Sequence, residues 1–124
     1  MASHQISVSV NTRFVAEQSA PEDGRYVFAY TITLRNTGNV RAKLLTRHWV
    51  ITDSNGRVEE VRGPGVVGEH PHLAPGEAFR YTSAAAIETP VGTMHGSYQM
   101  LGDDGLTFDA PISPFRLSAS QMFH

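Results

Sequence analysis

The sequence predicts an all-β domain, built as a β-sandwich or a small barrel. Apolar and polar residues alternate in several short runs, which is the period of a half-buried strand. The 11 Gly and seven Pro residues separate those runs, as is typical of antiparallel sheets. No window carries apolar residues at the helical spacing i, i+3, i+4, i+7. A length of 124 residues fits a single domain that covers residues 1–124.

Three strands are expected in the first half of the chain. A first strand covers residues 6–10, where valine and isoleucine alternate with serine. The clearest strand covers residues 26–35, where aromatic or aliphatic side chains occupy five successive even positions. A third strand runs over residues 44–53, with Trp49 at its centre.

A hairpin is predicted next, because Asn55-Gly56 is a strong turn signal. Its return strand is expected at residues 57–62. Val58 and Val61 lie three residues apart in that strand, which predicts a bulge or an exposed edge. A long loop is expected over residues 63–76.

The second half of the chain is expected to add four strands, at residues 77–83, 94–101, 106–110 and 115–119. Residues 84–93 are expected to form a loop. Pro111 and Pro114 are expected to break the chain before the last strand, because proline cannot donate to a ladder. The ends, residues 1–4 and 120–124, are expected to fray. A single core is expected between the sheets, made of Phe28, Tyr30, Trp49, Phe79, Tyr98 and Phe108.

Composition argues against several functional classes. Twelve acidic and ten basic residues give a net charge of −2, which argues against a nucleic-acid partner or an anionic membrane. The absence of cysteine excludes disulfides and thiolate metal sites. No apolar stretch approaches the ~20 residues of a membrane span, and residues 1–10 lack the pattern of a secretory signal. A cytoplasmic location is therefore expected, and a weak homodimer through an edge strand stays open.

The glycine-rich stretch contains a G-x-G-x-x-G motif at Gly63, Gly65 and Gly68. In dinucleotide-binding folds this motif holds a pyrophosphate at the N-terminus of a helix. Here two prolines follow the motif and oppose a helix, and Glu69 adds a negative charge. We expect a turn that caps the sandwich. A backbone nest that binds phosphate is the alternative.

Candidate metal ligands and catalytic groups are sparse. His70 and His72 could reach one metal ion from an extended segment, but a zinc site takes three or four protein ligands. Exposed loop histidines are therefore expected. The carboxylates of Glu59 and Glu60 are expected to point to opposite sides of a strand. We expect no catalytic residues, no cofactor and no enzymatic activity.

Four phrases occur in order along the chain: RHW-x-I-T-D at residues 47–53, G-x-G-V-V-G at 63–68, L-x-P-G-E at 73–77 and G-x-M-x-G-x-Y at 92–98. Together they resemble the ApaG family, over about residues 8–117. The resemblance implies a fibronectin type III or immunoglobulin-like β-sandwich of about seven to eight antiparallel strands.

The resemblance also carries functional implications. ApaG domains occur fused in F-box proteins and in a polymerase-delta-interacting protein, which implies a binding module. The bacterial family is linked to cobalt resistance and magnesium efflux. A pyrophosphate-binding role has been suggested for its glycine motif. His70 and His72 depart from the family pattern, which has Gln and an aliphatic residue there, and this weakens a metal site.

We therefore predict a non-catalytic module that binds an unidentified protein. The predicted contact patch is an apolar pair with charged neighbours: Arg62, Val66, Val67 and Glu69. Val66 and Val67 could instead pack onto the end of the sandwich. The alternative function is nucleotide or pyrophosphate binding at the glycine motif, and direct binding of a divalent cation by His70 and His72 ranks third.

Overall fold

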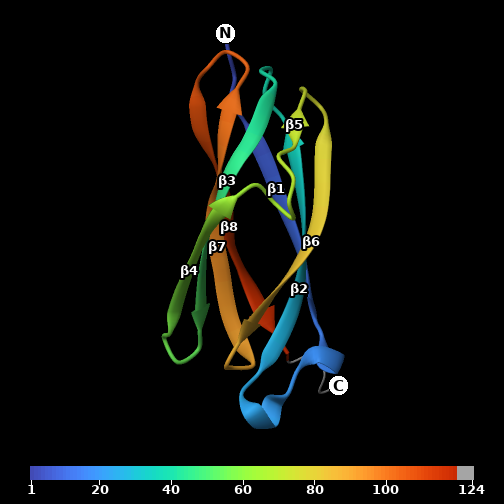
Figure 1. Cartoon of the computed structure of the whole chain (residues 1–124), viewed down its shortest axis with the longest axis vertical. Coiled ribbons are helices and arrows are strands. Elements are labelled where there is room, and N and C mark those ends of the chain that lie inside the picture. The colour runs from blue at the N-terminus through green and yellow to red at the C-terminus, as the bar shows by residue number, and fades with distance from the viewer. Residues whose placement is uncertain (120–124) are drawn as a thin grey trace.

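The computed structural model describes residues 1–119. The strands are β1 (Ile6–Phe14), β2 (Tyr26–Asn36), β3 (Ala42–Asp53), β4 (Val58–Pro64), β5 (His72–Leu73), β6 (Ala78–Ile87), β7 (Val91–Gly102) and β8 (Thr107–Ser118). Two one-turn 3₁₀ helices, η1 (Ala16–Gln18) and η2 (Pro21–Asp23), lie between β1 and β2. The strands form two antiparallel sheets that face each other (Figure 1). The predicted fibronectin type III-like sandwich is confirmed.

The order of the strands leaves one side of the sandwich open. One sheet has the order β1-β2-β6, and the other has the order β4-β3-β7-β8 with β5 paired to the start of β3. β1 contacts β8, which closes one side between the two sheets. β6 and β4 are the edge strands on the opposite side. The candidate site lies there.

The core consists of the aromatic side chains that the alternation predicts, together with aliphatic residues from both sheets. Trp49 lies at its centre, with ring centroids 5.3 Å from Tyr30 and 6.4 Å from Tyr98. Such edge-on contacts suit aromatic quadrupoles. Four of the predicted core residues are buried and two are partly buried against them: Phe28, Tyr30, Trp49 and Tyr98, then Phe79 and Phe108.

The predicted loop at residues 84–93 is wrong. β6 continues to Ile87, and β7 already begins at Val91. Alanine has a weak strand preference, but Ala84 to Ala86 pair with residues 27–29 of β2. Tertiary pairing therefore overrides the local preference.

The predicted break at Pro111 and Pro114 is also wrong, because β8 runs through both. β8 is an edge strand, so a missing N–H on its outer side costs no ladder hydrogen bond. The register shifts where Met94 pairs with Phe115 and Gly96 pairs with Ile112. Pro114 lies within this bulge, a position that tolerates proline.

The return strand of the hairpin, β4, extends to Pro64, two residues further than expected. Its register against β3 is regular, so the exposed-edge alternative is confirmed and the bulge is not present. Val58 is 59% exposed on this edge.

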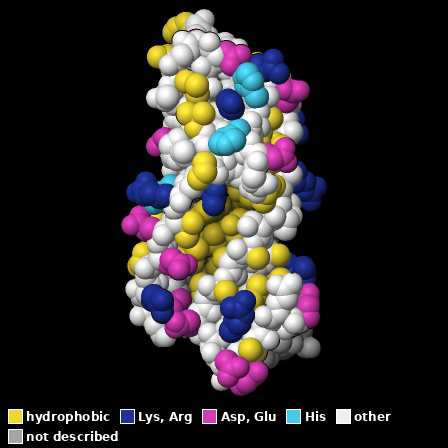
Figure 2. Space-filling view, viewed as in Figure 1, with side chains coloured by type: hydrophobic (Ala, Val, Ile, Leu, Met, Phe, Trp, Pro, Cys, Tyr) yellow, Lys and Arg dark blue, Asp and Glu magenta, His cyan; other side chains and the backbone are white. Residues whose placement is uncertain are grey.

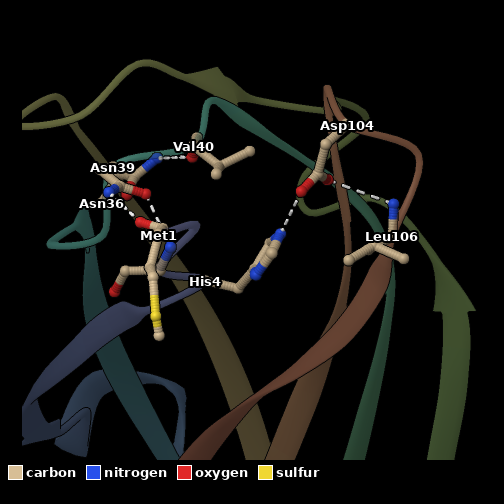
Figure 3. A network of polar contacts seen from close by, with 8 residues as sticks. Met1, His4, Asn36, Asn39, Val40, Asp104 and Leu106 are labelled. Atoms are coloured by element: carbon tan, nitrogen blue, oxygen red, sulfur yellow. Dashed lines mark hydrogen bonds and ion pairs between the residues drawn. The ribbon is translucent and has the colours of Figure 1, made fainter.

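The N-terminal residues are held in place, so the prediction of a frayed segment at 1–4 is wrong. The backbone N–H of Ser3 donates to the Asn39 side chain at 2.6 Å. His4 Nε2 lies 2.7 Å from Oδ2 of Asp104, and the backbone N–H of Leu106 donates to the other carboxylate oxygen, Oδ1 (Figure 3). Residues 120–124 lie outside the described residues. Within residues 1–119, no helix is long and apolar enough to cross a bilayer.

Candidate functional site

The open side of the sandwich contains a groove between β4 and β6, which we call the β4–β6 groove. Two adjoining hollows of about 370 Å³ and about 400 Å³ form it. A third, of about 100 Å³, continues it toward the hairpin at the start of β4. Figure 2 shows hydrophobic side chains within the β4–β6 groove. The two larger hollows share four lining residues: Tyr30, Arg47, Trp49 and Ser83.

Small side chains on the two edge strands keep the groove open. On β6, Ser83 and Ala85 are partly buried on the inward side, between larger buried residues. On β4, Val61 pairs with Trp49 and Gly63 pairs with Arg47, so both lie on the inner face. None of these side chains is large enough to fill the space over the aromatic floor.

Arg47 owes its position to a bulge in β3. The register of β3 against β7 shifts between Leu44 and Thr46. Because a bulge inverts the side-chain alternation that follows it, Arg47 shares the inner face with Trp49. The backbone N–H of Gly65 donates to the Leu45 carbonyl at 2.9 Å, so the bulge also anchors the glycine stretch.

The guanidinium of Arg47 is held over β4 and has no carboxylate beside it. Its Nη1 donates to the carbonyls of Pro64 and Gly65, both at 2.9 Å. A Cβ on Gly63 would lie 2.9 Å from Nη2, so glycine at this position makes room for the guanidinium. Within residues 1–119, none of the five ion pairs involves Arg47.

The remaining glycines of the motif form a tight turn. Val66 and Glu69 pair with each other through two backbone hydrogen bonds, at 2.8 Å and 2.9 Å. Val67 and Gly68 are the central residues, with φ of 43° and 81°, the pattern of a type I′ turn. Gly65 also has a positive φ, and a Cβ there would meet the Glu69 carbonyl at 2.4 Å. The motif caps the sandwich, as the sequence predicts, and no helix follows it within residues 69–119.

This turn offers little to a pyrophosphate. The N–H groups of Gly65, Val66 and Glu69 already donate to carbonyls within the protein. A nest would need such amides directed at an anion. Glu69 is exposed on the turn and adds a negative charge.

The predicted contact patch is divided by the fold. Val66 is 1% exposed and belongs to the core, whereas Val67 at the tip of the turn is 54% exposed. Arg62 is exposed on β4, beside Pro64 on its outer side. A partner could reach Val67, Arg62 and Glu69. Val66 is buried in the core beneath them and cannot contact a partner directly.

The side chains of His70 and His72 face different groups and do not converge on one position where a metal ion could bind. His70 Nδ1 lies 3.0 Å from the Leu44 carbonyl, and His72 Nε2 lies 2.6 Å from a carboxylate oxygen of Asp103. Within residues 1–119, no three His, Asp or Glu side chains gather as metal ligands would. Glu59 and Glu60 point apart, as predicted: Glu59 lines the groove, and Glu60 contacts His48 at 2.9 Å.

Two buried tyrosines stand beneath the groove. The Tyr81 and Tyr98 hydroxyls hydrogen-bond to each other. Burial raises the pKa of Tyr81 to about 12. The hydrogen bond with Tyr98 lowers this pKa but does not offset the effect of burial. Burial also raises the pKa of Tyr98, and the neighbouring Tyr81 adds to that rise. The positive charge of Arg47 acts in the opposite direction on both. Both hydroxyls are therefore neutral at physiological pH.

Sequence reasoning missed Arg47 and the groove. One signal for Arg47 was present. Arg47, Trp49 and Ile51 occupy alternate positions, so their side chains lie on the same face of the strand, the face that carries the core tryptophan. The groove had no local signal, because it depends on which strands become the edges of the two sheets.

Comparisons with known proteins agree with this fold. The ApaG domain family matches residues 16–102. Protein ApaG of Azotobacter vinelandii is 57% identical over 121 residues, which cover 98% of this chain and 96% of the relative. Protein ApaG of Azoarcus sp. strain BH72 is 60% identical, covering 98% and 95%. The crystal structure of an ApaA protein from Bordetella pertussis superposes with a TM-score of 0.90 at 51% identity, covering 93% of this chain and 94% of that one. The chain belongs to the ApaG domain family.

Proposed function

We propose that this chain is a non-catalytic module that binds a partner protein, and that the β4–β6 groove is its binding site. The observation that carries the proposal is the open side of the sandwich. There, an apolar floor that contains Tyr30 and Trp49 lies between two edge strands, each of which pairs on one side only within residues 1–119. Such edges accept an extended segment as an added strand.

The segment would lie along β6 or β4 and direct alternate side chains onto the aromatic floor. Main-chain hydrogen bonds to the edge would supply affinity, and the hollows would supply specificity. Val67 lies at the end of the groove nearest the glycine turn and lines the same hollow as Trp49. It can therefore extend the contact beyond the edge strands.

The cobalt and magnesium phenotypes of the family fit an indirect route, in which the partner and not this chain handles the ion. A cytoplasmic location suits the same role. Pyrophosphate binding at Gly63, Gly65 and Gly68 gains no support from the turn, whose amides of Gly65, Val66 and Glu69 are already engaged.

Site-specific photo-crosslinking in the native cell tests the groove. Ser83 lies on the inner side of β6, and Thr82 beside it is exposed on the outer face, where it hydrogen-bonds to Thr31. A crosslinker at position 83 is expected to capture a partner that one at position 82 does not. With the crosslinker moved to Val67, which lines the same hollow, Ser83→Phe fills the hollow and should abolish capture, whereas Thr82→Phe should not. Equal capture from both positions, or capture that survives Ser83→Phe, would show that the groove is not the binding site.

A further inference from the structure

We infer that the β4–β6 groove selects an extended peptide with an acidic residue and a basic residue four positions apart. This inference rests on the proposed function and specifies the partner segment. It follows from three features of the groove: a fixed cation at one end, carboxylates at the other, and the strand geometry between them.

The cation is Arg47. Of the residues that line the hollow beside the glycine turn, it alone carries a full charge. The walls around it are largely aromatic and aliphatic, which weakens competition from water and strengthens a charged hydrogen bond. Two backbone carbonyls already fix the guanidinium through Nη1. The planar fork is therefore preorganised for a carboxylate.

The opposite end of the groove is acidic. Asp53, Glu59 and Glu88 line it, together with a single guanidinium, that of Arg57. Arg57 is engaged with Glu88 at 2.6 Å. Glu59 is exposed, lines the neighbouring hollow as well, and takes part in none of the ion pairs within residues 1–119. It is the carboxylate open to a basic side chain.

The spacing follows from the register of β3 and β4. Glu59 pairs with Ile51, which lies four residues along β3 from Arg47. Four residues of extended chain span roughly 13 Å, and side chains at i, i+2 and i+4 point to one face. A peptide laid along the groove would therefore place its acid on Arg47, a small apolar residue over Trp49, and its base on Glu59.

A displayed library of nine-residue peptides, selected on the full chain, tests this inference. We expect enriched peptides to carry an acid and a base four positions apart and to lose binding to Ser83→Phe. Glu59→Lys should change the preferred basic residue to an acidic one and weaken an Asp-x-Val-x-Lys peptide about fivefold. Glu60→Lys makes the same charge change on the outer side of β4 and should leave the preference unchanged. Both residues are exposed on the edge strand β4, so these two variants should leave the fold intact.

The outcomes separate this inference from the proposed function. Peptides that bind in a Ser83→Phe-sensitive way but show no acid–base spacing would overturn the inference and leave the groove as a binding site. Equal effects of Glu59→Lys and Glu60→Lys would do the same. If no peptide binds in that way, both fail. If no peptide is selected and inorganic pyrophosphate binds at Arg47, both are overturned. The same holds if no peptide is selected and the groove binds a second copy of the chain.

Discussion

Arg47 and Gly63 face each other across β3 and β4, so closely that a Cβ at position 63 would lie 2.9 Å from the guanidinium. The first glycine of the G-x-G-x-x-G motif is therefore explained by a neighbouring cation and not by a bound phosphate. The second and third glycines have different reasons, a close carbonyl and a positive φ. One motif thus serves three separate structural needs.

These needs predict a graded response to alanine. Gly65→Ala should lower the free energy of unfolding by at least about 2 kcal/mol, because a left-handed φ is combined with a backbone collision. Gly68→Ala faces open space and should cost about 1 kcal/mol from its φ alone. Gly63→Ala should cost about 1 kcal/mol, because the guanidinium must shift slightly against its two hydrogen bonds but no backbone atom is in the way. Urea denaturation measures the series, and a largest loss at Gly63 would contradict this assignment.

Val67 is a β-branched residue at a φ of 43°, a conformation that strains such side chains. Val67→Asn should therefore raise the free energy of unfolding by about 1 kcal/mol and the melting temperature by a few degrees, because Asn-Gly suits a type I′ turn. The matched control is Val58→Asn, which changes another exposed valine within a strand and should bring no gain. If Val67 contacts a partner, the stabilised variant should also capture less of it. A melting temperature unchanged by Val67→Asn would show that the backbone conformation of Val67 is not strained.

The tyrosine pair predicts a loss of stability at alkaline pH. The pKa of Tyr81 is about 12 in the folded chain and 10.0 as its ordinary value. The unfolded chain therefore releases this proton first, and the stability present below pH 10 is lost as pH rises toward 12. The slope from Tyr81 should be about 1.4 kcal/mol per pH unit between those values. Chemical denaturation at pH 8 to 12 measures it, with the double variant Tyr81→Phe, Tyr98→Phe as the control. An equally steep slope in the double variant would exclude the pair as its source.

The N-terminal contact predicts a measurable shift at Asp104. Desolvation acts against its charged form, but the Leu106 N–H and His4 outweigh it and hold the pKa of Asp104 below its ordinary value. His4→Ala should raise that pKa part of the way back, because the Leu106 hydrogen bond remains. Carboxyl ¹³C titration by NMR reads the change. The same pKa in the variant would mean that His4 does not stabilise the carboxylate in solution.

The fold was largely predictable because most of its signals are local. The alternation from Tyr26 to Leu34 reports a strand with one face in the core, and Asn55-Gly56 reports a hairpin. The proline-containing β8 was not predictable in this way. Pro111 and Pro114 are tolerated only because β8 lies at an edge and contains a bulge, and both conditions are set by distant strands.

The candidate site was less predictable than the fold. The sequence placed Val66 and Val67 together in one patch, but the type I′ turn buries the first and exposes the second. Arg47 became part of the site through the bulge at Leu45, and the groove itself exists because β4 and β6 are edges that do not pair. Long-range topology, which no local pattern encodes, decides both.

The most direct test of the binding groove is amide hydrogen exchange of the chain with and without the partner captured from position 83. The account predicts that added protection concentrates along β6 and β4, on the backbone groups that face the groove, with the β1 and β8 side unchanged. Protection confined to the glycine turn, or to the closed side where β1 contacts β8, would contradict it.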